Sequence, residues 1–357
     1  MSAPSWHSVR VTYYDGQDGL LLDGVRPLFA SVRHRVAAAY FQRHWLRGPH
    51  LRLHFRAAPE VFAARVRPAI DEWIGGYLAS RPSAAEVDEP RLLALHAKLA
   101  RAEAERGPLT PLYPDNSIDE IAYDPRLHTL GGHAASSLLS ELYVATDDLA
   151  FEMIAAIRAG GARLAPCFDL LVATAHAFSA HGLRDGFVSF HSHAEAFLAT
   201  TGRADRLRAA WDRQAAALGP GLRARVPEVV AALAGGGESK SVPFVREWID
   251  RLAPLAKRAE DLIVRGELSL DRPSSREKVA SISPFHGTLA GSEVYWTKVH
   301  DAPWFSRYRF MLNYLYLQLT RLGITPAERF LLCYLVARTA EEVFGVTAED
   351  LVEQSSK

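Results

Sequence analysis

The alternation of apolar and polar positions near the N-terminus predicts a small antiparallel sheet. Residues 8–15 (SVRVTYYD) alternate and are rich in β-branched and aromatic side chains, as is typical of a strand. Residues 37–48 and 49–57 have the same character, and they meet at a Gly-Pro dipeptide that is typical of turns. Residues 117–125 (SIDEIAYDP) predict a further strand or an extended arm.

Most of the remaining chain repeats its apolar residues with the 3.6-residue period of amphipathic helices. A short helix is expected over residues 25–36. Pro59 opens a longer helix, in which Pro68 should produce a kink. Four or five helices are expected between residues 134 and 233, where glycine-rich breaks such as the Gly-Pro-Gly of residues 219–221 separate them.

The C-terminal part is also predicted to be helical. Residues 306–322 are apolar and aromatic, and the next helix begins with a capping box formed by Thr325 and Glu328. Before them, residues 268–298 are expected to be irregular, and a triple glycine indicates a flexible linker near residues 235–240. This order of elements predicts an α+β fold, in which a small antiparallel sheet near the N-terminus packs on a large, mainly helical body.

The composition narrows the function. Lys and Arg number 41 and so do Asp and Glu, which gives a formal net charge of zero and argues against nucleic acid as a partner. No apolar run is long enough to cross a bilayer, and no secretory signal opens the chain. The two cysteines, Cys167 and Cys333, lack any CxxC spacing. We therefore expect a cytoplasmic protein without a thiolate metal site.

The segment GPHLRLHF of residues 48–55 raises the first question of chemistry. Because side chains alternate along a strand, His50, Arg52 and His54 share one face, whereas the leucines and the phenylalanine between them share the other. The apolar face belongs in a core. The polar face is either a solvated surface or part of a binding site.

Three segments carry a resemblance to a known family. They are GPHLRL, the stretch from Tyr123 to Gly132 (YDPRLHTLGG), and the helix LYLQLTRLG, which ends at Gly323. Together they resemble the thiopeptide-type bacteriocin biosynthesis domain, the glutamate-eliminating C-terminal domain of class I lantibiotic dehydratases. The resemblance runs over most of the chain and implies a single domain of that fold over residues 1–357.

The departures from the family pattern indicate a change of reaction. Arg126 stands where the family has Glu, Thr129 where it has Arg, and Tyr316 where the eliminating enzymes have His. Eliminating glutamate requires cations for the leaving carboxylate and a base for the α-proton. In these losses and in its size, the chain is similar to the thiopeptide pyridine synthases, a branch of the family that performs a formal [4+2] aza-cycloaddition.

That resemblance implies an enzyme that joins two dehydroalanines of a ribosomally made peptide into a pyridine, with loss of water and of the leader peptide. The partner would be a dehydrated, azole-containing precursor with its leader, and no cofactor or metal is implied. Two alternatives remain open. One is a glutamate-eliminating lyase of a split lantibiotic-type dehydratase, and the other is a non-catalytic module that binds precursor peptide.

The candidate site follows from the resemblance and from residue chemistry. A spacing of two residues on a helix points side chains in different directions, so His191, His193 and Glu195 are not expected to share a metal. His193 alone is a candidate proton shuttle, although an ordinary helix histidine is the alternative. The expected catalytic residues are Tyr295, Ser292, His193 and Arg52, and the expected substrate-binding residues are His50, His54, Tyr123, Thr129 and Tyr316.

Overall fold

The computed structural model describes residues 2–103, 105, 107–235, 240–270 and 275–354, with the side chains of residues 102, 128 and 354 excepted. The chain forms two compact units. Unit 1 comprises Met1–Ser136 and Tyr143–Gly160, and unit 2 comprises Ser137–Leu142 and Gly161–Lys357. Each unit is described by itself below.

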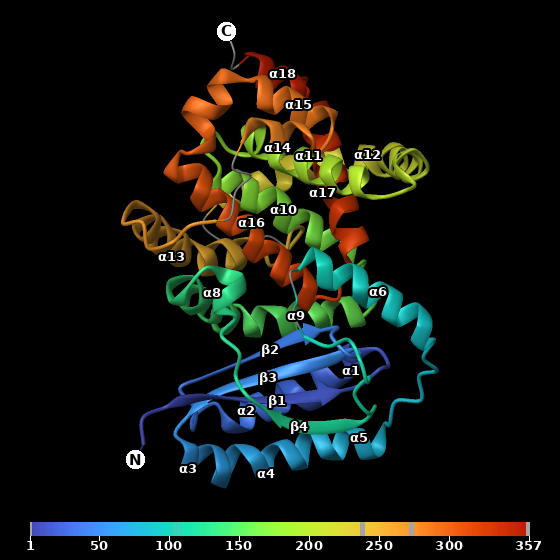
Figure 1. Ribbon diagram of the computed structural model, residues 1–357, viewed down its shortest axis with the longest axis vertical. Helices are drawn as coiled ribbons and strands as arrows, with labels where there is room; N and C mark the ends of the chain where they lie inside the picture. Colours follow the sequence, from blue (N-terminus) through green and yellow to red (C-terminus); the bar gives the residue numbers. More distant parts are fainter. Residues whose placement is uncertain (1, 104, 106, 236–239, 271–274, 355–357) are drawn as a thin grey trace. The chain divides into compact units, whose positions relative to one another are not determined.

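Unit 1 contains the antiparallel sheet that the alternating pattern predicts (Figure 1). The strand order is β2-β3-β1-β4, and every neighbouring pair is antiparallel. The bounds of the strands are β1 Ser5–Thr12, β2 Ala38–His44, β3 His50–Ala57 and β4 Ser117–Ile121. The small N-terminal sheet and the helical remainder confirm the α+β fold class.

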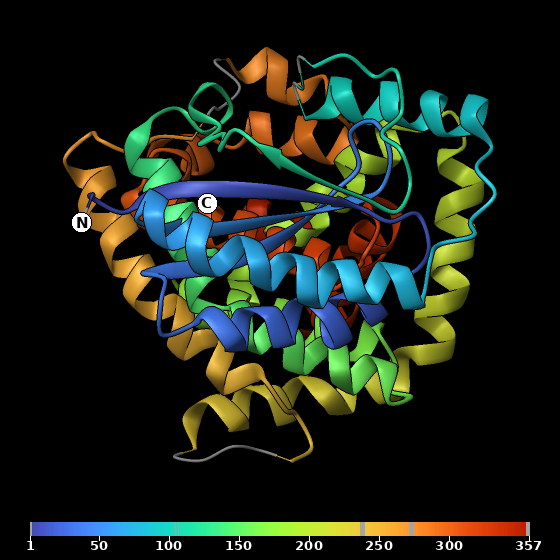
Figure 2. The ribbon, with the colours of Figure 1, turned by 90° about the horizontal axis from the view of Figure 1, so that it is seen from below.

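Helices cover the apolar face of this sheet, and they lie side by side across it (Figure 2). The first runs through α1 Gln17–Leu20, a π-helical segment and α2 Arg26–Val32. Phe29 of α2 contacts Phe55 of β3 and Phe151 of α9 Asp147–Arg158. Burying each such side chain contributes about 1.5–3 kcal/mol, so this layer holds the sheet in place.

The second covering helix begins at Pro59, as predicted, and stays helical to Ser80. It accommodates Pro68, which cannot donate a hydrogen bond, with π-helical segments at Phe62–Val66 and Asp71–Gly75 on either side. The remaining helices that lie wholly in unit 1 are α6 Glu89–Ala102 and α7 Leu127–Leu130, whereas α8 His133–Ala145 is shared between the units.

The regular secondary structure of unit 2 is helical in its described residues. At its centre the fully buried Trp248 donates a hydrogen bond from Nε1 to Thr174 Oγ1 at 2.9 Å. The predicted capping box is present at Thr325 and Glu328. The helices are α10 Leu164–Phe178, α11 Leu183–Thr200, α12 Ala204–Ala234, α13 Val245–Val264, α14 Arg276–Ala280, α15 Pro284–Gly291, α16 Pro303–Arg321, α17 Pro326–Phe344 and α18 Ala348–Gln354.

Two predictions about unit 2 are wrong. The Gly-Pro-Gly of residues 219–221 does not break the chain, because α12 continues through it and buries Trp211 on one side and Val229 on the other. The region 268–298 is not irregular, since it contains α14, α15 and the start of a π-helical segment, Tyr295–His300. Serine N-caps begin α14 and α15 and supply the hydrogen bonds that propensity alone did not indicate.

The linker expected near residues 235–240 falls mostly on residues 236–239, which lie outside the described part of the chain. Among the described helices, none has the length and apolar character that crossing a membrane requires.

The turn between β2 and β3 yields a stability prediction. Gly48 has a φ of +113°, and a Cβ there would collide with the ring of Tyr14, whose hydroxyl donates to the Tyr113 carbonyl at 2.7 Å. We expect Gly48→Ala to lower the free energy of unfolding by about 1–3 kcal/mol or more. Gly16→Ala is the control, because its φ is −57° and its Cβ would meet open space. Equal effects of the two variants in urea unfolding would contradict this account of the turn.

Candidate functional site

The polar face of the unit 1 sheet is organised in rows by the strand register. Side chains opposite one another on neighbouring antiparallel strands lie within contact distance. Successive rows on this face are His44, His50, Thr12 and Ser117, then Gln42, Arg52, Arg10 and Asp119, and then Tyr40, His54, Ser8 and Ile121.

His54 is held as a neutral ring in the third row. Burial, with a smaller effect from the charge of Arg52, lowers the pKa of His54 to about 3. Ser8 Oγ lies 2.7 Å from its Nδ1, and Gln42 Oε1 lies 3.3 Å from its Nε2. An amide oxygen only accepts, so we place the ring proton of His54 on Nε2, which donates to Gln42. The Ser8 hydroxyl then donates to Nδ1.

His50 and Arg52 contact each other directly, as the strand alternation predicts. Burial lowers the pKa of His50 to about 3. Its Nδ1–H donates to the Gly48 carbonyl at 2.8 Å, so its Nε2 can accept from Arg52 Nε at 3.3 Å. Burial and then the charge of Arg126 lower the pKa of Arg52. Among the described residues, no carboxylate lies within ion-pair distance of Arg52, so its guanidinium can receive an acceptor from a ligand.

The other expected binding residues of unit 1 differ in outcome. Tyr123 joins the cluster, because its ring stacks on Trp6 at 5.3 Å and meets the His54 ring edge-on at 5.4 Å. Thr129 is exposed on α7, and its recorded hydrogen bond is from its backbone N–H to the Arg126 carbonyl. Within the described part of unit 1, the structure records no contact between the Thr129 side chain and the sheet residues.

In unit 2 the structure brings His193 and Tyr316 together. His193 Nδ1 lies 2.6 Å from Tyr316 Oη, which lies 3.4 Å from Cys333 Sγ. Burial lowers the pKa of His193 to about 3 and raises the pKa of Cys333 to about 12, so both groups are neutral. The short separation is typical of a phenol donating to an imidazole nitrogen. We infer that the Cys333 thiol donates to the Tyr316 hydroxyl, which in turn donates to His193 Nδ1. The imidazole proton then lies on Nε2.

Ser292 and Tyr295 are neighbours at the start of the π-helical segment. Ser292 is buried, and its Oγ accepts from the Tyr295 backbone N–H at 3.2 Å and donates to the Val352 carbonyl at 3.5 Å. The Tyr295 ring lies among Trp296, His300 and Phe305. Sequence reasoning placed Tyr295 in a loop, whereas the structure places it on a helical turn.

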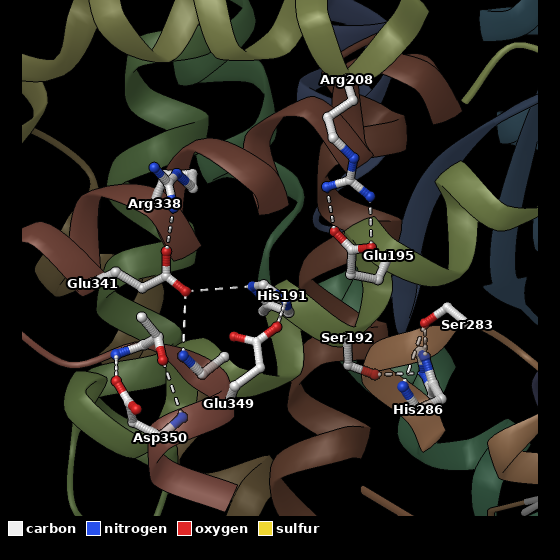
Figure 3. A network of polar contacts seen from close by, with 12 residues as sticks. His191, Ser192, Glu195, Arg208, Ser283, His286, Arg338, Glu341, Glu349 and Asp350 are labelled. Carbon is white, nitrogen blue, oxygen red and sulfur yellow. Dashed lines mark hydrogen bonds and ion pairs between the residues drawn. The ribbon is translucent and has the colours of Figure 1, made fainter. Parts of the chain in front are cut away.

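His191 and Glu195 on α11 have different partners. In Figure 3, His191 points between Glu341 and Glu349, while Glu195 points toward Arg208. Both carboxylate oxygens of Glu195 accept from Arg208 at 2.7 Å. Each residue of α11 therefore serves a different neighbour.

The group of His191, Glu341 and Glu349 offers ligand atoms that lie within 4.8 Å of one another, as a metal would require. However, Glu341 already accepts from Arg338 at 2.9 Å and from the Ala348 backbone N–H at 3.2 Å. The hydrogen bond from His191 is the main cause that lowers the pKa of Glu349. We interpret this group as an ion-pair anchor that holds α18 against α11 and α17.

Sequence reasoning missed several of these partners. Cys333 was considered only for disulfide or metal chemistry. His286 was not considered, yet it lies between Ser283 at 2.8 Å and Ser192 at 3.0 Å (Figure 3). Only the Ser283-x-x-His286 spacing gave a local signal, that of an N-cap at the start of a helix. The other pairings join residues far apart in sequence.

The sequence of the chain matches the pattern of a known protein family. The chain belongs to the lantibiotic biosynthesis dehydratase C-terminal family, whose sequence pattern matches residues 6–340. The family resemblance predicted above is therefore confirmed.

Two solved structures are similar to this chain. TbtD, described as the pyridine synthase from thiomuracin biosynthesis, is 37% identical with a TM-score of 0.80, and the match covers 95% of this chain and 99% of TbtD. TsrL is 24% identical with a TM-score of 0.71, and the match covers 99% of this chain and 99% of TsrL. This likeness shows that the two proteins share a fold. No curated protein matches the chain. The expected likeness to the thiopeptide pyridine synthases is confirmed by the first of these structures.

The depressed histidine pKa values predict how stability depends on pH. In the unfolded chain these rings bind a proton below about pH 6.5, whereas folded His50, His54 and His193 do so only near pH 3. The unfolded state therefore binds more protons between these values, and stability falls as the pH is lowered below about 6.5, by up to about 1.4 kcal/mol per pH unit for each ring.

Urea unfolding at a series of pH values checks this dependence. We expect His54→Gln to remove about one proton from the slope at about pH 5. If His54→Gln had the slope of the unsubstituted protein, the neutral, buried state of His54 would be refuted.

Proposed function

We propose that this protein catalyses a formal [4+2] aza-cycloaddition between two dehydroalanines of a ribosomally made precursor peptide. The observation that carries the proposal is the 37% identity to the pyridine synthase TbtD over 95% of the chain. The substrate is a dehydrated, azole-containing precursor that still carries its leader. The product is the pyridine core of a thiopeptide macrocycle.

The reaction begins with a proton shift. The amide that joins one dehydroalanine to its neighbour becomes an iminol as its proton moves from nitrogen to oxygen, which creates a 2-azadiene. The two terminal carbons of the diene, the iminol carbon and the dehydroalanine CH2, then form two C–C bonds with the second dehydroalanine and close a six-membered ring. Loss of the iminol oxygen as water and of the leader peptide as an amide gives the aromatic pyridine. The sequence is redox-neutral, so it requires no electron acceptor.

The demands on the protein are ordering and hydrogen bonding. Holding the two alkenes together supplies about 7–11 kcal/mol that a bimolecular encounter would lose. The proton shift needs a donor at the amide oxygen and an acceptor near the nitrogen, worth about 10²–10⁴-fold. We assign the donor at the amide oxygen to His193 Nε2–H. To the Tyr295 hydroxyl, which can accept one proton while it donates another, we assign the removal of the proton from the nitrogen, with Ser292 supporting the turn that carries Tyr295. Arg52 of unit 1 is assigned the holding of a backbone carbonyl elsewhere along the peptide.

The electrostatics favour this reaction over glutamate elimination. Elimination needs a base for the α-proton, but His193, with a pKa of about 3, is too weak a base near neutral pH. By the family resemblance, Tyr316 stands where the eliminating enzymes have a histidine. A neutral imidazole fixed by Tyr316 instead donates a hydrogen bond, as a polarised amide oxygen requires. A module that only binds peptide would not need this arrangement.

Mass spectrometry of a linear, dehydrated, azole-bearing precursor incubated with the pure protein tests the proposal. We expect a macrocycle together with an amidated leader, the two differing in total mass from the substrate by one water. Binding without a change in mass would contradict the enzyme assignment. Release of glutamate from a glutamylated precursor, without cyclisation, would establish the eliminating alternative.

A pair of substitutions at His193 tests the donor role. Glutamine places its amide N–H close to the position of imidazole Nε2, whereas asparagine places its amide near Nδ1. We expect His193→Gln to keep most of the turnover and His193→Asn to lose about 10²–10³-fold, the usual effect of removing an aimed donor. Single-turnover rates measure both variants. Equal inactivity of the two would show that His193 transfers a proton instead.

A further inference from the structure

Four buried side-chain atoms of unit 1 have no hydrogen-bond partner among the described residues. They are Arg10 Nε, Thr12 Oγ1, His44 Nε2 and His96 Nδ1. Thr12 is 0% exposed and His96 is 1% exposed. Native proteins pair nearly all such atoms, so a group of them needs a physical explanation.

These four residues gather at one end of the polar sheet face. The register places Thr12 and His44 on either side of His50 in the same row, and Arg10 follows in the next row of β1. The rings of His44 and His50 are 5.1 Å apart, and His44 stacks on Trp45 at 5.8 Å. Trp45 in turn contacts the ring of His96, from α6, at 5.2 Å.

The side chains of this face differ in whether their polar atoms have hydrogen-bond partners. Both ring nitrogens of His54 have partners, and so do both nitrogens of His50. The unpaired atoms of the sheet lie in the first two rows, on either side of His50 and next to Arg52. Poor packing of the sheet as a whole does not account for this distribution, because the ring nitrogens of His50 and His54 on the same face are all paired.

The chemistry of the atoms indicates what would satisfy them. His44 Nδ1 accepts the Leu46 backbone N–H at 3.1 Å, and burial lowers the pKa of His44 well below its usual range, so the ring is neutral with its proton on Nε2. Arg10 Nε–H is also a donor, and the Thr12 hydroxyl can donate. The charge of Arg10 is already matched by Asp119 at 2.9 Å. This end of the face therefore offers donors without an excess of positive charge, apart from Arg52.

We propose that Arg10, Thr12, His44 and His96 form a binding subsite for uncharged hydrogen-bond acceptors, namely the backbone carbonyl oxygens and azole nitrogens of the precursor's core peptide. This inference rests on the proposed function and adds the place where the peptide is held, next to Arg52. Peptide binding would satisfy the atoms that the free protein leaves unpaired.

The test measures both the stability of a Thr12 variant and its affinity for a ligand, because loss of the subsite should weaken binding without destabilising the free protein. Thr12→Val keeps the shape and the β-branching but removes the unpaired hydroxyl. We expect the free protein to be as stable as the unsubstituted one or more stable, because no hydrogen bond is lost. We expect the affinity for a ligand to fall about 2- to 10-fold, as one hydrogen bond to the ligand is removed.

The ligand for this test is a leaderless synthetic peptide with two thiazoles and no dehydroalanine, which cannot react, and calorimetry measures its binding. Thr174→Val is the matched control. Thr174 is equally buried at 0% exposure, but its Oγ1 accepts from Trp248 at 2.9 Å and donates to the Leu170 carbonyl at 2.7 Å. We expect this control to lose thermal stability and to keep the affinity for the peptide.

The outcomes separate the subsite from the proposed reaction. Weaker peptide binding by Thr12→Val with undiminished stability supports the subsite, even if no cyclisation is observed. A stability loss like that of Thr174→Val, or an unchanged affinity, overturns the subsite even if the protein cyclises its precursor. Failure of the unsubstituted protein to bind the peptide also overturns it. Acetate serves as a second ligand, and competition by acetate with the peptide would show that the site prefers anions and overturn the assignment to uncharged acceptors.

Discussion

Desolvation of polar side chains is the constraint on which the rest of the site depends. His50 and His54 are buried and His193 is half-buried, none of them paired with a carboxylate among the described residues, and desolvation lowers the pKa of each to about 3. Each ring is therefore a neutral group with one donor and one acceptor. Its neighbours then determine which nitrogen carries the proton, and so determine what the ring can offer to a substrate.

This constraint separates the molecule from an enzyme that handles a leaving anion. Arg52 remains as a cation, but the nitrogen it contacts belongs to a neutral histidine. Hydrogen bonds of fixed direction suit the polarisation of amides and the holding of an extended peptide. The reaction proposed here depends on these two effects, and it needs no strong base.

The sequence predicted the parts of the fold whose signals are local. Strand alternation indicated the sheet and the shared face of His50, Arg52 and His54, and the capping box marked the start of α17 correctly. Propensity failed at the Gly-Pro-Gly of α12, where buried residues on both sides keep the helix continuous. It also failed in residues 268–298, where short capped helices carry little periodicity.

The candidate site was predictable only in part, because most of its contacts join distant segments. Alternation alone cannot show that Ser8 and Gln42 flank His54, since these neighbours depend on the register of three strands. The pairing of His193 with Tyr316 was indicated only through the family resemblance, and Cys333, which completes that chain, had no signal at all.

The most direct test of whether His50, His54 and His193 are neutral is a titration of the histidine ring signals by NMR. Single substitutions of the three residues assign the signals. We expect these three rings to stay neutral throughout the pH range in which the protein remains folded. A midpoint near 6.5 for any of the three rings would contradict this expectation, because that ring would then be a charged group or a base rather than a fixed neutral donor.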